Sequence, residues 1–181
     1  MKLNKVLVAL IFSSLMILPG CMESEDKVST LTIEVTDAIT DDYSNVYVNF
    51  TSVEVHGTDS KWVTIVDEES SVDLLTLGRE GITELLGDSV LDAGKYTQIR
   101  MHVDSAYAID KQGEIVDVKT PKKIKINRPF TLEEGEDMTI IIDIDLERSL
   151  KEKDSGLELQ PVIGYVDDGK EKTVDPTVES E

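Results

Sequence analysis

The stretch KYTQIRMHVDSAYAI, residues 95–109, is the longest extended run of the chain and decides its fold class. Ile99, Met101 and Val103 alternate with polar residues, and this two-residue period is typical of a strand with one buried face. The intervening side chains, from Gln98 to Asp104, face the opposite side of the strand. We therefore expect a long strand in a sheet that covers a core.

Shorter runs with the same period flank this stretch on both sides. The apolar parity slips by one residue between Phe50 and Val53, which predicts a β-bulge or a bend. Leu132 and Gly135 repeat the spacing of Leu91 and Gly94, so we expect the strands after these turns to play equivalent parts in a two-sheet core. The remaining expected strands are Leu31–Thr36, Val46–His56, Trp62–Val66, a short strand at Val72–Leu75, Glu114–Lys119, Lys122–Ile126, Met138–Leu146 and Leu157–Tyr165.

One segment has helical spacing instead. Ile82, Leu85 and Leu86 lie three and four residues apart, and Gly87 stands where a helix C-cap glycine is expected. This pattern predicts one or two helical turns over an open end of the sheet. Trp62 is expected to cover one end of the core.

Many short strands separated by turn residues, with one brief helix, predict an all-β fold: an antiparallel β-sandwich of the immunoglobulin-like or prealbumin-like type. A parallel α/β fold would need several full helices. With 181 residues, the chain has room for one such domain, which we place at residues 30–166. Pro161 argues for an edge or a bulge in the last strand. Residues 167–181 are polar and acidic and are expected to form a disordered tail.

The N-terminus has the features of a secretory leader. Lys2 and Lys5 precede an uncharged run from Val6 to Leu18. That run is too short to span a hydrocarbon core about 30 Å thick, but its length is typical of a signal peptide. Small Gly20 directly precedes Cys21, the only cysteine of the chain. An uncleaved anchor with a free thiol at this cysteine is the alternative.

The stretch 18–21 resembles a lipobox, where a signal peptidase cuts before a cysteine that carries a diacyl group. We therefore expect residues 1–20 to be a lipoprotein signal peptide, Cys21 to be lipidated, and residues 21–29 to form a flexible tether. Two acyl chains hold a protein stably on a membrane. This predicts a cell-membrane location on the extracytoplasmic face.

The net charge of the chain is −19 at pH 7. Such a surface repels nucleic acid and anionic lipid headgroups, so we expect no nucleic-acid partner. The acidic surface could take part in binding a ligand; the alternative is that it serves only to keep the protein soluble. With its single cysteine assigned to lipid, the domain is expected to have no internal disulfide, and its stability must come from core burial.

Several segments together resemble a family of surface lipoprotein domains known only as domain of unknown function 4382. The resemblance spans residues 30–165. It rests on Leu31–Ala38 (LTIEVTDA), Asp41-Asp42, Val46–His56 (VYVNFTSVEVH), Trp62-Val63, Val72–Leu75 (VDLL), Ala93–Arg100 (AGKYTQIR), Val103-Asp104, Ala106-Tyr107, Asp143–Asp145 (DID) and Arg148-Ser149.

The turn Gly94-Lys95-Tyr96-Thr97 also looks like the Gly-x-Tyr turn of prealbumin-like sandwiches, such as carboxypeptidase regulatory-like domains and adhesin repeats. This similarity implies a sandwich of seven or more strands and of a non-catalytic type. It carries over no catalytic residue. Some adhesin repeats cross-link a lysine of an early strand to an asparagine, but Leu31–Thr36 contains no lysine, so we do not predict that bond.

The best candidate for a metal site is the acidic loop with Asp37, Asp41 and Asp42. Calcium takes six to eight oxygen ligands, and closely spaced carboxylates can supply them. The loop lacks the glycine of a calcium-binding loop, so turn capping and a solvated acidic rim are the alternative. Apart from this calcium ion, no cofactor is expected.

A second polar cluster is expected near matching strand ends, where we predict an ion-pair belt rather than a ligand site. Its members are Asp104, Asp143, Asp145 and Arg148. The two histidines, His56 and His102, lack the x-His-x-His spacing of a zinc site.

The sequence has no Gly-x-Ser-x-Gly nucleophile elbow, and its lone cysteine has another role. We therefore expect no enzyme activity. The prediction is a membrane-anchored, extracytoplasmic lipoprotein that acts as a binding or adhesion module, or as a subunit of a surface assembly, with a protein or carbohydrate ligand. The alternative is a calcium- or carbohydrate-binding accessory domain of a transport or degradative complex.

Overall fold

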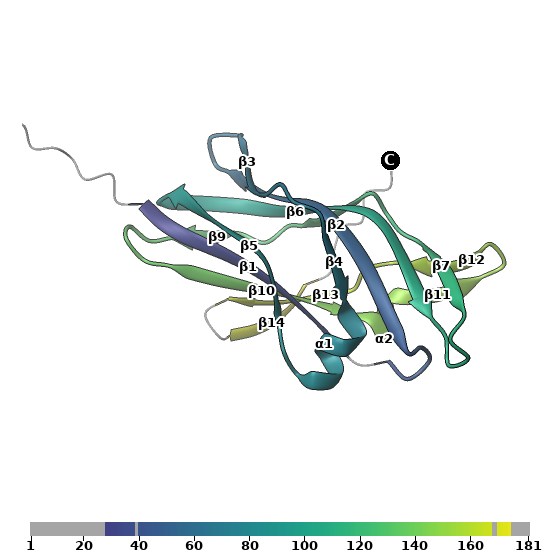
Figure 1. The fold of residues 1–181 in the computed structure, drawn as a ribbon. Coiled ribbons are helices and arrows are strands. Elements are labelled where there is room, and N and C mark those ends of the chain that lie inside the picture. The colour runs from purple at the N-terminus through teal and green to yellow at the C-terminus, as the bar shows by residue number, and fades with distance from the viewer. Residues whose placement is uncertain (1–27, 39, 168–169, 175–181) are drawn as a thin grey trace, which may run out of the picture.

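The computed structural model describes residues 28–38, 40–167 and 170–174 (Figure 1). Within these residues the chain forms fourteen strands and two short helices in two sheets, so the expected all-β sandwich-like fold is confirmed. The first sheet has the order β14 (Lys170–Val174), β13 (Ile163–Asp167), β10 (Met138–Asp145), β1 (Val28–Ala38) and β5 (Glu84–Asp92).

The second sheet is larger. Its order is β11 (Leu150–Lys153), β12 (Gly156–Leu159), β7 (Ile115–Lys119), β6 (Gly94–Ile109), β2 (Asn45–Gly57) and β3 (Trp62–Val66). Three short strands join it at the sides: β4 (Ser70–Asp73) pairs with β2, while β8 (Lys123–Ile126) and β9 (Phe130–Leu132) pair with β6. The helices are α1 (Leu74–Glu80) and α2 (Leu146–Ser149).

One hydrophobic core lies between the sheets. The apolar sets that alternate in the sequence are buried in it, including Ile99 and Met101 of β6 and Ile140 and Ile142 of β10, all at 0% exposure. Complete burial of such a side chain stabilises the fold by about 1.5–3 kcal/mol. β6 and β10 lie in different sheets, and each contributes buried residues to the core between them.

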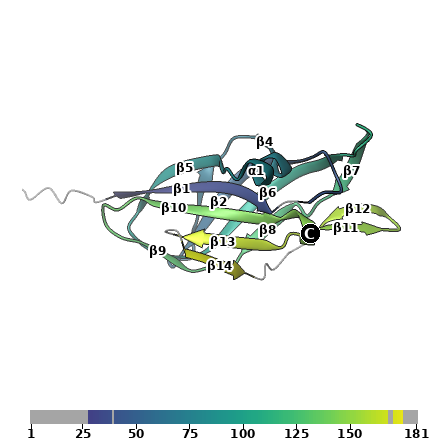
Figure 2. The ribbon, with the colours of Figure 1, turned by 90° about the horizontal axis from the view of Figure 1, so that it is seen from below.

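Two strand pairs are parallel, although the sequence predicts an antiparallel sandwich. β1 runs parallel to β10, from Leu31 opposite Met138 to Ala38 opposite Asp145, and β7 runs parallel to β12. Figure 2 shows β1 and β10 side by side, with the β11–β12 hairpin at one end of the molecule. A two-residue period shows which face is buried but carries no strand direction. A parallel pair needs a long connection, and here the chain passes through the second sheet between β1 and β10.

The closing strand expected at Leu157–Tyr165 is two strands in different sheets. β12 belongs to the second sheet and β13 to the first. Pro161, expected at an edge or a bulge, lies between them, where the chain crosses from one sheet to the other. Proline fits this position because the crossing backbone makes no ladder that its missing N–H would interrupt.

The expected helix at residues 82–86 is wrong in position. The helix is α1, and Gly81, in the left-handed conformation with φ 63°, is its C-cap. Residues Glu84–Asp92 form β5, which pairs with β1. Gly87 ends no helix: a Cβ atom built on it would lie 2.5 Å from Cγ2 of Val66, so it permits close contact between β5 and β3.

The domain observed in the structure begins and ends at other residues than the sequence predicts. β1 begins at Val28, two residues before the expected start, and β14 lies within the expected tail of residues 167–181. The expected signal peptide (residues 1–20), Cys21 and most of the expected tether lie outside the described residues. In the part of the chain that is described, no helix is long and apolar enough to cross a membrane.

Candidate functional site

The face of the second sheet that points away from the core is called the outer face here. Alternation along β2 and β6 places polar and aromatic side chains on it, because their neighbours are buried. Both histidines of the chain and three of its aromatic residues lie on this face. Its main members are Tyr47, Asn49, Glu54, His56, Trp62, Arg100, His102, Ser105 and Tyr107.

Two bulges coincide at the middle of β2 and β6. Asn49 lies opposite Ser105 and Phe50 opposite Val103, so Asp104 is an extra residue in β6. Thr51 is likewise an extra residue in β2, because the next pair joins Ser52 to His102. The parity slip expected in β2 is confirmed, and β6 slips with it. Each bulge re-aims its side chains, which increases the number of polar groups on the outer face.

A hollow of about 260 Å³ lies beside these bulges. β2, β6, the start of β4 and the residue before it contribute amide, hydroxyl and carboxylate groups as well as apolar surface to its lining. The lining residues are Asn49, Phe50, Thr51, Glu69, Ser70, Ser71 and Asp104.

Hydrogen bonds hold one wall of this hollow in a fixed arrangement. The amide Nδ2 of Asn49 donates to Oγ of Ser105 at 2.8 Å, and Oγ of Ser105 donates to Oδ2 of Asp104 at 3.2 Å. Lys122 anchors the bulge from β6's other side, where its Nζ donates to the backbone carbonyl of Asp104 at 2.7 Å. The side chains of Asn49 and Asp104 are therefore linked through Ser105.

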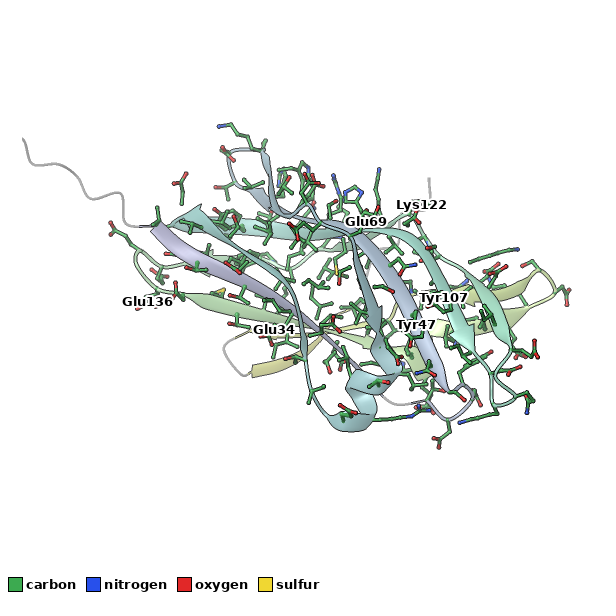
Figure 3. The ribbon with its side chains drawn as sticks, viewed as in Figure 1. Glu34, Tyr47, Glu69, Tyr107, Lys122 and Glu136 are labelled. Atoms are coloured by element: carbon green, nitrogen blue, oxygen red, sulfur yellow. The ribbon has the colours of Figure 1, made fainter. Side chains whose placement is uncertain are left out.

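Two stacked tyrosines lie next to the hollow. The rings of Tyr47 and Tyr107 are 4.8 Å apart at an interplanar angle of 17°, since these residues face each other across β2 and β6. Figure 3 labels the pair, together with Glu69, which precedes β4, and Lys122, which precedes β8. Burial raises the pKa of Tyr47, and the nearby Asp73 and Tyr107 raise it further, so the phenol stays neutral.

A second network occupies the other half of the outer face. Oε2 of Glu54 accepts hydrogen bonds from Nε2 of His102 at 2.9 Å and Nη1 of Arg100 at 3.4 Å. The guanidinium of Arg100 lies 3.6 Å from the ring centroid of Trp62. Trp62 also contacts His56, whose ring lies 4.8 Å away.

The expectation that Trp62 covers one end of the core is therefore wrong. Trp62 lies opposite His56, an outward position of β2, so its ring lies on the outer face. Ile65 is the residue of β3 that enters the core. Hydrophobicity alone suggested a core role, but the parity of β3 determines the direction of the ring.

The three aspartates of the expected calcium site do not converge. Asp37 is buried, at 7% exposure, and its Oδ1 accepts a hydrogen bond from the backbone N of Leu146 at 2.9 Å. It thereby satisfies a free N–H at the start of α2. Asp41 and Asp42 are exposed. Among residues 28–38, 40–167 and 170–174, no group of three His, Cys, Asp or Glu side chains is placed to hold a metal ion.

The expected ion-pair belt is only partly formed. Asp145 caps α2 by accepting a hydrogen bond from the backbone N of Arg148 at 2.9 Å, and their side chains are 3.9 Å apart. Asp143 lies on the same strand, β10. Asp104 belongs to β6 in the other sheet and interacts with Lys122 instead. Sequence spacing could not show that these positions fall in different sheets.

A larger hollow, of about 660 Å³, lies between the β11–β12 hairpin and the β6–β7 turn. No sequence pattern indicated it, because its residues come from three separate segments of the chain. Burial raises the pKa of Tyr43 there, and Glu152, Asp42 and Asp110 raise it further. Its lining residues are Asp42, Tyr43, Asp110, Val116, Glu152, Lys153, Gly156 and Leu157.

Comparison with known proteins places the chain in a family. Residues 28–161 match the family model described as Domain of unknown function (DUF4382). The chain belongs to this family. The resemblance seen in the sequence is thereby confirmed, and the match of the DUF4382 domain covers both bulges, the tyrosine pair and the Glu54 network. Neither functionally curated proteins nor solved structures gave a match.

Proposed function

We propose that this DUF4382 protein is a lipid-anchored, extracytoplasmic binding module, without enzyme activity, that recognises its ligand through the outer face of β2 and β6. The observation that carries the proposal is the concentration of oriented polar groups and aromatic rings on this one face. Two long, fully paired strands hold these groups. A rigid base of this kind lowers the entropic cost of binding.

The position of the tether supports the same function. From Cys21 to Val28 the extended chain reaches at most about 25 Å, which would keep the start of β1 close to the membrane. β6 begins near that end, since Val28 pairs with Asp92 and Gly94 begins β6. The tyrosine pair lies near the opposite end of β6. With Cys21 lipidated, the tyrosine pair would lie at the end of β6 that is farther from the anchor.

The experiment that tests the anchor is metabolic labelling with an alkyne fatty acid, followed by membrane fractionation and protease shaving of intact cells. The intact protein is expected to carry the label, to sediment with membranes and to be cleaved from outside. C21A should abolish the label. C21A/S24C serves as a matched control, since it retains a thiol but displaces it from the cleavage site. Label on this double variant, or an unlabelled wild type, would refute the proposal.

The calcium alternative receives no support from the positions of Asp37, Asp41 and Asp42. The carbohydrate alternative is favoured by a specific observation, namely the hollow beside a pair of aromatic rings. The protein-ligand version needs an exposed apolar anchor, and exposed apolar side chains occur on both sheets, at Leu85 and Val90 of β5 and at Ile115 of β7.

A further inference from the structure

We infer that the hollow at the two bulges, together with Tyr47 and Tyr107, is a binding site for a neutral saccharide. This inference rests on the proposed function, because it names the ligand class of the same outer face. Three features support it: the polar groups of the hollow, the adjoining tyrosine rings, and the local charge.

The polar groups match the hydrogen bonding of a sugar. A saccharide offers adjacent hydroxyls that both donate and accept, and it binds best to fixed amide, hydroxyl and carboxylate groups. Asn49 and Asp104 are fixed through Ser105, as described above. Thr51, Ser70 and Ser71 add hydroxyls around the same hollow. The volume of about 260 Å³ suits one or two sugar rings rather than a folded partner.

The tyrosines supply the apolar contact that a sugar also needs. Tyr47 and Tyr107 lie two residues beyond Asn49 and Ser105 on the same face, a step of roughly 7 Å. The C–H face of a saccharide can pack on a tyrosine ring while its hydroxyls reach the polar tip. Because the phenol of Tyr47 stays neutral, it also remains a hydrogen-bond donor.

The local charge selects neutral sugars. Glu69 and Asp104 line the hollow, and Asp73 lies beside Tyr47. Lys122 is the nearby cation, and it is engaged by the backbone carbonyl and the carboxylate of Asp104. A uronate or sulfated saccharide would meet like charges in a chain of net charge −19. We therefore exclude acidic saccharides from the ligand class.

The test is native affinity electrophoresis of the full-length protein through gels that contain a defined polysaccharide. The neutral probes are xylan, galactomannan, mixed-linkage β-glucan and glycol chitin, and polygalacturonate is the acidic probe. At least one neutral probe should retard the protein, whereas polygalacturonate should leave its mobility unchanged. No retardation by any neutral probe, or stronger retardation by polygalacturonate, would overturn the inference.

Three site variants and one control locate the site. Y107A and N49A should weaken retardation at least tenfold, and Y43A, a matched loss of a tyrosine ring from the larger hollow, should change it less than twofold. D104N keeps the size of an exposed side chain, so it should fold normally and still weaken binding severalfold. Wild-type retardation of the folded D104N and N49A proteins would show that the sugar binds elsewhere.

Lipid labelling and affinity electrophoresis together separate this inference from the proposed function. A protein that is labelled at Cys21 and exposed on cells, yet is retarded by no neutral probe, would keep the lipid-anchored module and reject the saccharide. A protein without the lipid label that is retarded through Asn49 and Tyr107 would keep the saccharide site and reject the anchor.

Discussion

Replacing Gly87 with alanine tests how the two sheets meet at β3 and β5. The new Cβ would lie 2.5 Å from Cγ2 of Val66, far inside normal contact, whereas Cβ of Val66 lies 3.4 Å away. Overpacking of this kind costs about 1–3 kcal/mol. V66A removes the clashing methyl and leaves the 3.4 Å contact, so G87A should cost little in that background.

The assay is a double-mutant cycle of denaturant unfolding on wild type, G87A, V66A and G87A/V66A. V66A alone should cost about 1 kcal/mol, because two partly buried methyl groups are lost. The double variant should be more stable than the sum of the single effects predicts, by about 1 kcal/mol or more. By contrast, G81A, at a left-handed position with no atom within 4 Å, should cost about 1 kcal/mol with no rescue by V66A. Additive effects of G87A and V66A would refute the close contact of β5 with β3.

Three further predictions concern single interactions. D37A should lower the free energy of unfolding by about 1–3 kcal/mol, because the buried N–H of Leu146 loses its acceptor, and millimolar calcium should leave the melting temperature of both proteins unchanged. The pKa of Tyr47 is raised in the fold, so the folded state favours the neutral phenol. The stability that this preference contributes is complete below about pH 10 and is lost as the pH rises further. In urea titrations between pH 8 and 11, Y47F should therefore lose less stability than wild type. R100A should cost about 1 kcal/mol or less in thermal unfolding and should red-shift the fluorescence of Trp62, which loses the guanidinium stacked on its ring; an unchanged spectrum would contradict that contact.

Much of the fold could be predicted from the sequence because alternation of apolar residues has one physical cause, burial of one strand face. Ile99, Met101 and Val103 lie inward as their spacing indicates, and the slip after Phe50 marks the bulge. Strand direction and sheet membership have no such local signature. The parallel neighbours β1 and β10, and the separation of Asp104 from Asp143, therefore depend on the global path of the chain.

The errors in the sequence interpretation have specific causes. Ile82 and Leu85 fit a helical period by chance, and both side chains are exposed, at 46% and 54%. Leu74 and Leu75 are fully buried and belong to the helix that does form. The candidate site was harder to predict than the strands. The bulge in β6 is visible only when β6 is aligned with its partner strand β2, and the hollow joins residues from three strands.

The most direct test of the central claim, that the outer face binds a ligand outside the cell, is hydroxyl-radical footprinting. Radicals are generated outside intact cells and, separately, in a solution of the purified protein, and the oxidation rate of each tyrosine is compared. We predict that Tyr47 and Tyr107 oxidise several times more slowly on cells, whereas Tyr43 reacts equally in both samples. Equal rates for Tyr47 and Tyr107 in the two samples, or no oxidation of the protein on intact cells, would contradict the account.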